Sequence, residues 1–378
     1  MKNYSFKIPQ NIEFGLGSLH KLAEILDKSE HVLLISDKGL AAIGVVKMVE
    51  DILGHSGIGY TKFLDVKPNP TIDIVTAATE AFKNCGATSI IALGGGSPID
   101  VAKATGVLAT YAGKITDYEG NHKVPGPIVP IIAIPTTAGT GSEVTASAVI
   151  TDEARNYKMT VFSYEMLPKY AILDPKLIMS APSHIAAACG VDALIHAMEA
   201  YLSVNATPFS DAMAEKAMEM IGRSIRRFVA NREDVEAACD MMAGSNFAGI
   251  AFAWARLGCI HAMSHPVSAY FNVPHGVANA ILMPTVMSYN ALTDNGRYEK
   301  IYNYICKGKA NYTSAVDLVY EVEYLNEDLG IPQSLSEVGV TEDKIVAMAE
   351  DAAKSANTLA NPRQTTASDI AELYRKAL

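Results

Sequence analysis

The first half of the chain alternates between two hydrophobic periods. A continuous apolar run at 32–35 is typical of a strand buried on both faces, and it follows a segment with helical spacing over 19–26. The alternation recurs, because a helical pattern over 74–82 leads into the apolar segment 89–94, and a further apolar run occupies 128–135. It predicts an open α/β sheet with helices on both sides.

The second half has a different pattern. From about residue 184 the chain is rich in alanine, methionine, leucine and glutamate, and apolar residues recur at helical spacing, as at 345, 348, 349 and 352. We therefore expect an all-helical second domain. Pro182 and Ser183 are typical of a helix start, so the predicted domains are 1–181 and 182–378.

Composition narrows the possible partners. The 378 residues are 49% apolar, and the net charge of −10 comes without any run of like charges. A nucleic-acid or anionic membrane surface needs clustered Lys and Arg, so we expect a small-molecule partner instead. The five cysteines form no C-x-x-C pair, which favours reduced thiols in a cytoplasmic protein. No apolar stretch approaches a membrane span in length, so we expect no membrane segment.

Two glycine-rich segments follow predicted strands. In "GGGSPIDVAK" (94–103) the glycines allow backbone N–H groups to approach an anion near a helix start expected at Pro98; the alternative is a tight strand-to-helix turn. The second segment, "PTTAGTGSE" (135–143), favours a dinucleotide over a single phosphate. Asp37 follows the first strand, where a carboxylate can bind the ribose of NAD and repel the phosphate of NADP, or can simply cap a turn.

Three of the nine histidines lie within fifteen positions, at His261, His265 and His275. His261 and His265 are four apart on a predicted helix, and a break near 272–274 places His275 in a loop. Asp192 and His196 are also four apart on a predicted helix. Two helices and a loop could therefore offer one carboxylate and two or three imidazoles to Fe(II), Zn(II), Co(II) or Mn(II).

With these motifs the sequence resembles the iron-containing (group III, metal-dependent) alcohol dehydrogenase family over nearly its whole length. The resemblance rests on "FGLGSLHKL", "PNPT", "GGGSPIDVAK", "PTTAGTGSEVT", "VDALIHAMEAYLS", "HAMSHPVSAYFNVPHGVANAILMPTVMSYN" and "NPR". It implies a Rossmann-like N-terminal domain and a helical C-terminal domain, the architecture of dehydroquinate synthase. It also implies a homo-oligomer, such as a homodimer.

The resemblance assigns roles to individual residues. Asp192, His196, His261 and His275 match the family's metal ligands, for Fe(II) or alternatively Zn(II), while His265 matches a catalytic histidine near the nicotinamide. The positions that match NAD(H) contacts are Asp37, Asn69, Gly95, Gly96, Ser97, Asp100, Thr136, Thr137, Thr140, Thr145 and Lys158, and Asp100 lies toward the nicotinamide. The implied reaction is hydride transfer between nicotinamide C4 and a carbonyl carbon polarised by the metal, in an alcohol dehydrogenase or short-chain aldehyde reductase.

One segment departs from the family pattern. "AFAWARLG" (251–258) has Trp254 and Arg256 where relatives have small or neutral residues, and Phe252 matches a pocket position. We expect a substrate pocket that includes Ser147, Phe252, Trp254 and Arg256. Since Phe252 and Arg256 are four apart, they could share a helix face, and Arg256 could bind a sulfo-, phosphono- or carboxy-aldehyde; alternatively it points to solvent or pairs with an acid. A dehydroquinate synthase-like lyase is a further alternative.

Overall fold

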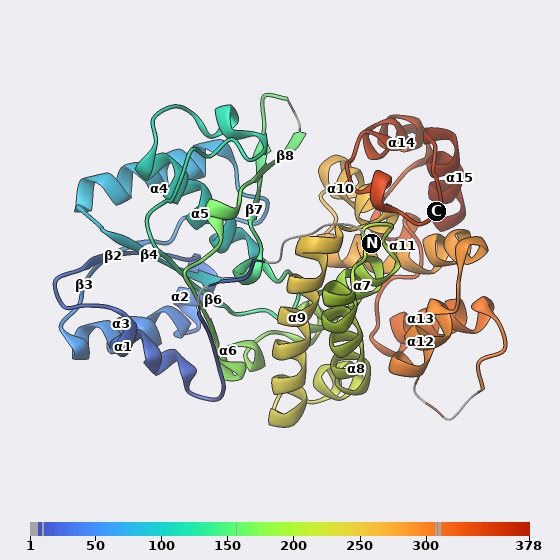
Figure 1. Ribbon diagram of the computed structural model, residues 1–378, viewed down its shortest axis with the longest axis horizontal. Coiled ribbons are helices and arrows are strands. Elements are labelled where there is room, and N and C mark those ends of the chain that lie inside the picture. Colours follow the sequence, from blue (N-terminus) through green and yellow to red (C-terminus); the bar gives the residue numbers. More distant parts are fainter. Residues whose placement is uncertain (1–6, 10, 156, 307, 309–310) are drawn as a thin grey trace. The chain divides into compact units, whose positions relative to one another are not determined.

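The computed structural model describes residues 7–9, 11–155, 157–306, 308 and 311–378. The chain divides into two compact units: the α/β unit, Met1–Thr137 with Gly141–Met179, and the helical unit, Ala138–Thr140 with Ser180–Leu378. All strands of the described residues belong to the α/β unit, as Figure 1 shows. The predicted fold class, an α/β domain followed by an all-helical domain, is confirmed.

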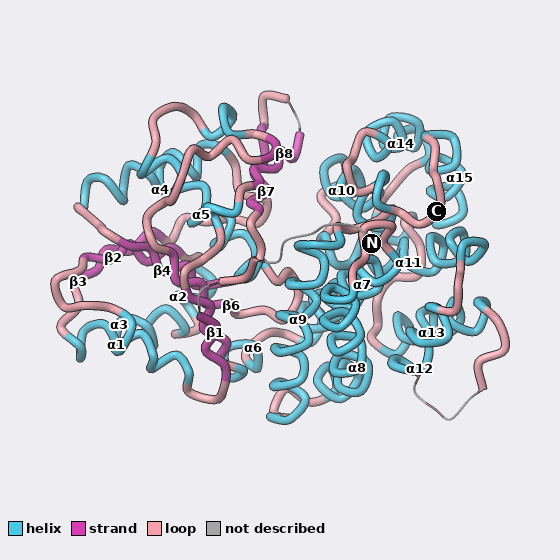
Figure 2. The backbone as a smooth tube through the Cα atoms, viewed as in Figure 1, coloured by secondary structure: helices cyan, strands magenta, loops and turns pink. Residues whose placement is uncertain are grey.

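Six parallel strands form the main sheet of the α/β unit, drawn in magenta in Figure 2. Their order across the sheet is β1-β9-β6-β4-β2-β3. The strands are β1 (Asn11–Phe14), β2 (His31–Ile35), β3 (Gly59–Phe63), β4 (Ser89–Gly94), β6 (Ile131–Pro135) and β9 (Tyr170–Leu173). Because parallel strands need crossover connections, helices cover both faces of this sheet.

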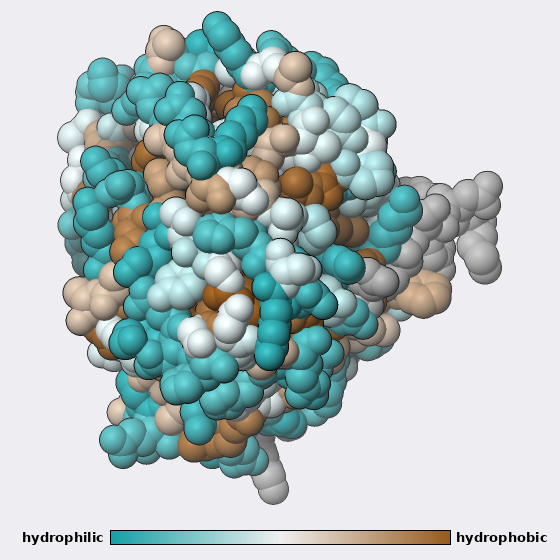
Figure 3. All heavy atoms as spheres, turned by 90° about the vertical axis from the view of Figure 1, so that its left-hand side faces the viewer, coloured by the Kyte–Doolittle hydropathy of each residue, from teal (hydrophilic) through white to brown (hydrophobic). Residues whose placement is uncertain are grey.

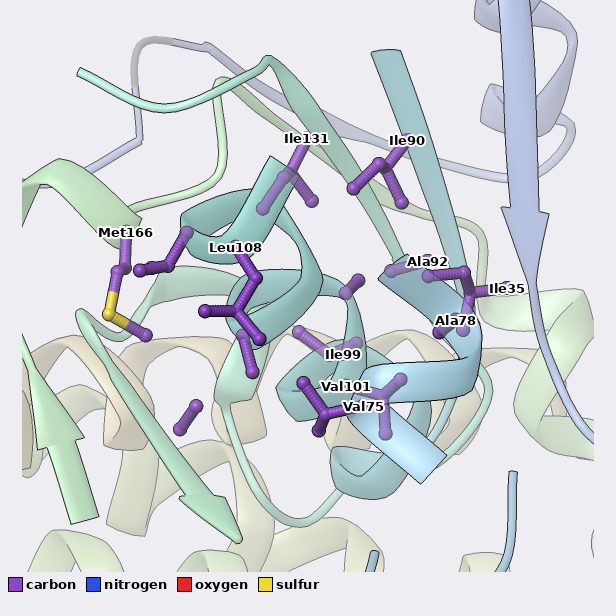
Figure 4. Close-up of a cluster of buried hydrophobic side chains, with 14 of the residues drawn as sticks. Ile35, Val75, Ala78, Ile90, Ala92, Ile99, Val101, Leu108, Ile131 and Met166 are labelled. Atoms are coloured by element: carbon purple, nitrogen blue, oxygen red, sulfur yellow. The ribbon is translucent and has the colours of Figure 1, made fainter. Parts of the chain in front are cut away.

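Side chains alternate along each central strand and enter two separate hydrophobic cores. Leu33 and Ile35 of β2 belong to the core that contains the inner faces of α4 (Ile72–Cys85) and α5 (Gly96–Thr110). Figure 4 shows this core, in which Ile35 from the sheet lies beside Ala78 of α4. The alternation explains why the apolar run is unbroken, since both faces of the strand are buried.

The other face of the sheet has its own core. Val32 and Leu34 of β2 pack there with α1 (Leu22–Ile25) and α3 (Val45–Ser56). In Figure 1, α1 and α3 lie on the opposite side of the strands from α4 and α5. The sheet is therefore the middle layer of three, as the sequence pattern predicts.

Two predicted helices differ in the structure from what the sequence pattern indicates. The segment 19–26 forms a 3-10 turn, Ser18–Lys21, followed by the single turn of α1, because Leu26 is already extended at φ −95° and ψ 137°. Helix α5 begins at Gly96 rather than Pro98. Pro98 thus lies in the first turn, where its missing N–H breaks no helical hydrogen bond.

A second sheet of three strands was not predicted. It consists of β5 (Gly120–Asn121), β7 (Ser147–Asp152) and β8 (Tyr157–Phe162), and β7 pairs with β8 in antiparallel register. The residues of β7 alternate between buried and half-buried, which is the pattern of a strand with one covered face. Two short helices complete the unit, α2 (Lys38–Ala42) and α6 (Pro175–Met179).

The helical unit consists of nine α-helices among the described residues, together with short 3-10 turns. They are α7 (Ser183–Leu202), α8 (Pro208–Ala230), α9 (Val235–Ala255), α10 (Cys259–Phe271), α11 (His275–Asn290), α12 (Arg297–Ile305), α13 (Ala315–Asp328), α14 (Ile345–Ala353) and α15 (Ala367–Ala377). By length and composition α7 could cross a membrane, but 78% of its most apolar window is buried inside the protein. Burial of this kind is typical of a core helix.

The surface of the α/β unit is mainly polar where Figure 3 shows it. Hydrophilic side chains predominate on this face, and apolar ones lie between them in small groups. A scatter of small apolar groups is ordinary for a protein surface and does not by itself indicate a partner.

The five cysteines of the chain are all free thiols, and only Cys259 is fully buried.

Helices α7 and α11 approach each other closely at Gly276. A Cβ atom placed on Gly276 would lie 2.4 Å from the backbone oxygen of Ala188, well inside van der Waals contact. Ala188 is one helical turn before Asp192, and Gly276 directly follows His275. The absence of a side chain at Gly276 therefore lets the start of α11 reach the part of α7 that carries Asp192.

We predict that Gly276→Ala lowers the free energy of unfolding of the protein by about 1–3 kcal/mol, because the new methyl group meets backbone that cannot move independently. Gly54→Ala is the control, since Gly54 lies in α3 and a Cβ there has no neighbour within 4 Å. That variant should be neutral or gain up to about 1 kcal/mol of helix propensity. Chemical denaturation measures both; a loss of stability in Gly54→Ala as large as that in Gly276→Ala would contradict the packing argument.

Candidate functional site

A cluster of one carboxylate and three imidazoles forms the centre of the helical unit. Asp192 and His196 lie on α7, His261 lies on α10, and His275 is the first residue of α11. Asp192 Oδ1 is 3.6 Å from His261 Nε2, 3.9 Å from His275 Nε2 and 3.9 Å from His196 Nε2. The expectation that His275 lies in a loop is wrong: Asn272 ends α10 at positive φ, and α11 then begins directly at His275.

These distances suit a shared divalent cation. Such ions bind imidazole nitrogen and carboxylate oxygen at ~2.1 Å, so two atoms on the same ion lie within ~4.2 Å of each other. All three measured distances from Asp192 Oδ1 meet this condition. The ligand atoms of Asp192, His261 and His275 lie within 4.8 Å of one another, which is close to this limit. One hard oxygen with several imidazole nitrogens is a donor set for Fe(II) or Zn(II).

Burial and the neighbouring charged groups together determine the protonation states of Asp192 and His196. Burial opposes ionisation of Asp192, but the surrounding histidines outweigh it and hold the pKa of this carboxyl well below its usual value. Burial lowers the pKa of His196 to about 4, against the opposing effect of Asp192. His196 is therefore neutral near pH 7, the form in which an imidazole binds a metal.

His196 is oriented by a backbone carbonyl. Its Nδ1 lies 3.2 Å from the carbonyl oxygen of Gly139, which can only accept, so Nδ1 carries the proton. Its Nε2, the atom nearer Asp192, is then left with a free lone pair. The His196 ring also stacks on that of His261, with centroids 4.6 Å apart and an interplanar angle of 21°.

Glu199 orients His261, and sequence reasoning missed it. Its Oε2 is 2.6 Å from His261 Nδ1, and its Oε1 accepts the backbone N–H of Ile260 at 2.7 Å. Burial lowers the pKa of His261, but the charges and hydrogen bonds of Glu199 and Asp192 together outweigh burial and raise it to about 9. A cation that binds His261 near pH 7 would therefore displace a proton from it. Its position three residues after His196 on the same helix was the available signal, since i,i+3 neighbours share a helix face.

His265 lies beside the cluster without joining it. It is half-buried, and its ring centroid is 5.3 Å from that of His275 and 6.4 Å from that of His261. The ligand atoms that lie within 4.8 Å of one another are those of Asp192, His261 and His275, so neither His265 nor His196 belongs to this group. His196 differs from His265 in that its Nε2 lies 3.9 Å from Asp192 Oδ1. This placement separates His265 from His261, which their spacing alone could not do.

The expected substrate-pocket residues are placed unevenly. The ring of Phe252 lies 4.4 Å from that of His196, and Trp254, two residues further along α9, is half-buried. Arg256 is exposed and lies beyond the end of α9, at φ 70° and ψ 175°, so the expected shared helix face with Phe252 is wrong. Ser147 lies in the α/β unit, at the start of β7.

In the α/β unit, the turn between β4 and α5 has the shape of an anion cradle. Gly94 has φ 150°, and a Cβ there would lie 2.5 Å from Pro98 Cγ, so only glycine fits. Gly95 precedes the first turn of α5, which starts with Gly96 and Ser97, and no side chain of Gly95 covers the N–H groups of that turn. The positive end of the helix dipole is thus accessible to a phosphate.

A fully buried lysine ties this helix to the second glycine-rich segment. Lys103 Nζ donates to Ser142 O at 2.7 Å, Thr145 Oγ1 at 3.1 Å and Ser147 O at 2.9 Å. Burial lowers the pKa of Lys103 to about 8, partly offset by the charges of Asp100 and Glu143. Lys103 had no role in the sequence-based prediction, although it ends the glycine motif.

Asp100 belongs to the same network. It accepts the Ser142 hydroxyl at 2.9 Å and the backbone N–H of Val149 at 3.0 Å. Burial raises the pKa of Asp100, and the charge of Lys103 acts in the opposite direction. Both carboxylate oxygens are therefore engaged within the unit, and Asp100 holds the segment after β6 against β7.

The remaining predicted NAD(H) contacts are spread over several loops. Asp37 caps α2 by accepting the backbone N–H of Leu40 at 2.9 Å, as the turn-capping alternative expects. Asn69 has φ 54°, and its Oδ1 accepts from Lys158 Nζ at 2.8 Å. The others directly follow β6 or lie close behind it: Thr136, Thr137 and Thr140, the last of which groups with the helical unit.

Family models match both halves of the chain. The model described as iron-containing alcohol dehydrogenase matches residues 9–175, and that described as Fe-containing alcohol dehydrogenase family, C-terminal, matches residues 186–378. Together they span nearly the whole sequence.

Individual proteins are similar over their full length. Lactaldehyde reductase of Escherichia coli K12 is 39% identical over 371 residues, which are 96% of this chain and 97% of that protein. NAD-dependent methanol dehydrogenase of Bacillus methanolicus is 36% identical over 379 residues, 99% and 100% of the two chains. A crystal structure of a 1,3-propanediol oxidoreductase superposes with a TM-score of 0.97 at 35% identity and covers 100% of both chains.

We predict that Glu199→Gln weakens metal binding about 10- to 100-fold, because the partner that holds the His261 imidazole loses its charge. Competition with a chelator measures the dissociation constants for Fe(II) and Zn(II). Glu215→Gln is the control, since Glu215 accepts the Tyr201 hydroxyl at 2.7 Å but contacts none of the four predicted ligands through that bond. Equal metal affinity in Glu199→Gln and the parent protein would contradict the orienting role.

Proposed function

Because the chain belongs to the iron-containing alcohol dehydrogenase family, we propose that it is a metal-dependent, NAD(H)-linked alcohol dehydrogenase that also reduces short-chain aldehydes. The observation that carries this proposal is the convergence of Asp192, His261 and His275, with His196 stacked beside them. The similar proteins are named for lactaldehyde, methanol and 1,3-propanediol, which are all small hydroxyl or carbonyl compounds.

The proposed metal ligands are Asp192, His196, His261 and His275, for Fe(II) or alternatively Zn(II). Bound there, the ion would serve as a Lewis acid toward the oxygen of the substrate. One carboxylate against a divalent ion leaves a net positive charge, which suits this chemistry. The chain supplies the geometry, because Glu199 and the Gly139 carbonyl hold two of the imidazoles in the tautomer that presents Nε2.

His265 is the proposed group for proton transfer. An imidazole titrates near neutrality, and His265 is half-buried beside the ligands rather than among them. It can therefore exchange a proton with the substrate oxygen while the nitrogen atoms of the metal ligands would remain bound to the cation.

The NAD(H) site is proposed for the α/β unit. The β4–α5 turn, with Gly95, Gly96 and Ser97, would bind the pyrophosphate, and Asp37 would accept the ribose hydroxyls. Asp100 would face the nicotinamide side, together with Thr145 of the segment that Lys103 anchors. The dinucleotide supplies the hydride, and these residues orient it.

We also propose a cytoplasmic enzyme that forms a homo-oligomer, with functional domains 1–181 and 182–378. The free cysteines are in keeping with a reducing compartment. Self-association is supported by the family resemblance alone.

We predict that enzyme loaded anaerobically with Fe(II) or Zn(II) oxidises NADH when given a short-chain aldehyde, with one alcohol formed per NADH. Removal of the metal with a chelator should abolish turnover, and adding Fe(II) back should restore it. Asp192→Ala should remain inactive after the same treatment, because the cation loses its only carboxylate ligand. Undiminished turnover by the chelated enzyme would overturn the proposal, and product formation without net NADH change would indicate a lyase.

The backbone at Arg256 favours a second, narrower candidate function. Its φ of 70° and ψ of 175° lie in a region that is almost exclusive to glycine, where another residue stores about 1–3 kcal/mol of strain. Strain of this kind is concentrated at functional sites. Arg256 ends the helix that places Phe252 against His196. We propose that Arg256 binds the anionic group of a sulfo-, phosphono- or carboxy-aldehyde.

We predict that Arg256→Gly raises the free energy of unfolding by about 1 kcal/mol and lowers kcat/KM for an anionic aldehyde at least tenfold, while a neutral aldehyde of equal length is unaffected. The gain reflects relief of backbone strain, and the selective loss reflects the missing guanidinium. Arg256→Lys, which keeps a charge but also the strain, is the matched control. An equal decrease in kcat/KM for both aldehydes would show that Arg256 does not recognise the charge of the substrate.

A further inference from the structure

Asn279 lies in contact with the candidate metal ligands. It is one helical turn after His275 on α11 and is completely buried. Its amide nitrogen Nδ2 lies 2.6 Å from Asp192 Oδ1, 3.1 Å from His261 Nε2 and 3.1 Å from His275 Nε2. One neutral side chain therefore touches three of the four proposed ligand atoms.

The direction of the shortest contact is fixed by chemistry. The ionised carboxylate of Asp192 can only accept, so the Asn279 amide N–H donates to Asp192 Oδ1. At 2.6 Å this is a short, charge-assisted hydrogen bond. It restrains the carboxylate in the orientation that directs Oδ1 toward the imidazoles.

Each of the other ligands also has one outer partner. The Nδ1 atom of His261 is held by Glu199, that of His196 by the Gly139 carbonyl, and that of His275 by the Ser264 hydroxyl at 3.5 Å. Asn279 differs from these partners, because it donates to Asp192 Oδ1, the ligand atom itself. A carboxylate oxygen has more than one lone pair, so Oδ1 can accept this hydrogen bond and still bind a cation. Partners of this kind set ligand orientation and cation affinity in metal sites.

An amide suits this position better than a carboxylate or an apolar group. An aspartate at 279 would bring a second negative charge next to Asp192, whereas the amide donates a hydrogen bond without changing the net charge of the ligand set. Asparagine at this position costs folding free energy, because Asn279 Oδ1 is buried and has no hydrogen-bond partner in the described structure. An apolar side chain would avoid that cost but could not hold Asp192.

We propose that Asn279 is a positioning residue for the metal centre, which fixes the Asp192 carboxylate through its amide N–H and thereby sets cation affinity. This rests on the proposed metal-dependent function. Asn279 does not need to touch substrate or NAD(H) for this role, so its effect should appear in metal binding itself.

The chain offers a matched control in Asn326. Like Asn279, Asn326 is buried in the helical unit, donates through its amide Nδ2 and has an unpartnered Oδ1. Its Nδ2 donates to the backbone oxygen of Ala280 rather than to a ligand. A loss that is only structural should therefore be shared by the two asparagines, whereas a loss of ligand positioning should be specific to Asn279.

The test compares Asn279→Ala and Asn279→Leu with Asn326→Ala and Asn326→Leu in the full chain. Leucine keeps the branching of asparagine at Cγ without its hydrogen-bonding atoms, so it tests the lost hydrogen bond without the cavity that alanine leaves. We expect Fe(II) and Zn(II) dissociation constants, measured by chelator competition, to rise 10- to 100-fold in the Asn279 variants and to stay within twofold in the Asn326 variants. The visible absorption spectrum of the Co(II)-loaded protein should shift only for Asn279.

Metal affinity and a Co(II) spectrum unchanged in Asn279→Leu would overturn this inference while leaving the proposed function intact. Equal losses in the Asn279 and Asn326 variants would also overturn it, because the effect would then be one of general stability. Failure of the parent protein to bind Fe(II), Zn(II) or Co(II) would overturn the proposed function and this inference together.

Discussion

The buried negative charge of Asp192 is the constraint around which the helical unit is organised. A carboxylate that is 3% exposed pays a large desolvation cost unless it is surrounded by donors or cations. The surrounding groups come from three helices: His196 from α7 itself, His261 from α10, and His275 with Asn279 from α11. Balancing this one charge therefore fixes where α10 and α11 must meet α7.

Glycines allow these helices to approach each other closely. One of them, Gly258, leaves room for Glu199 beside the first turn of α10. Gly258 precedes α10, and a Cβ there would lie 2.9 Å from Glu199 Oε1 and 3.0 Å from Asn361 Oδ1. Without a side chain, these two oxygens reach the first N–H groups of α10, at Ile260 and Cys259. Glu199 thus stabilises the positive end of the helix and orients His261 from the same position.

The sequence was sufficient for the fold class, because the change from buried strands to helical spacing is a local pattern. The grouping of Asp192 with His196 could likewise be read from a spacing of four on one helix. Contacts between different helices could not be predicted from local spacing in the sequence. The position of Asn279 opposite Asp192 depends on how α11 crosses α7, and the hydrophobic periodicity of the two helices does not determine that crossing. The helical start at His275 and the positive φ of Arg256 were missed because both depend on backbone geometry at helix ends.

Two buried charged side chains, Lys103 in the α/β unit and Asp192 in the helical unit, show how the surroundings decide what a charged group can do. The partners of Lys103 are carbonyl and hydroxyl oxygens of one continuous segment, 142–147, so satisfying its charge fixes that segment in place. The partners of Asp192 include imidazole nitrogens of His261 and His275, which lie within 4.8 Å of each other and of its own oxygen. The first arrangement is complete with the proton that lysine already carries, so it anchors a loop. The second brings a carboxylate oxygen and imidazole nitrogens together around one point, and a divalent cation would stabilise such a set further.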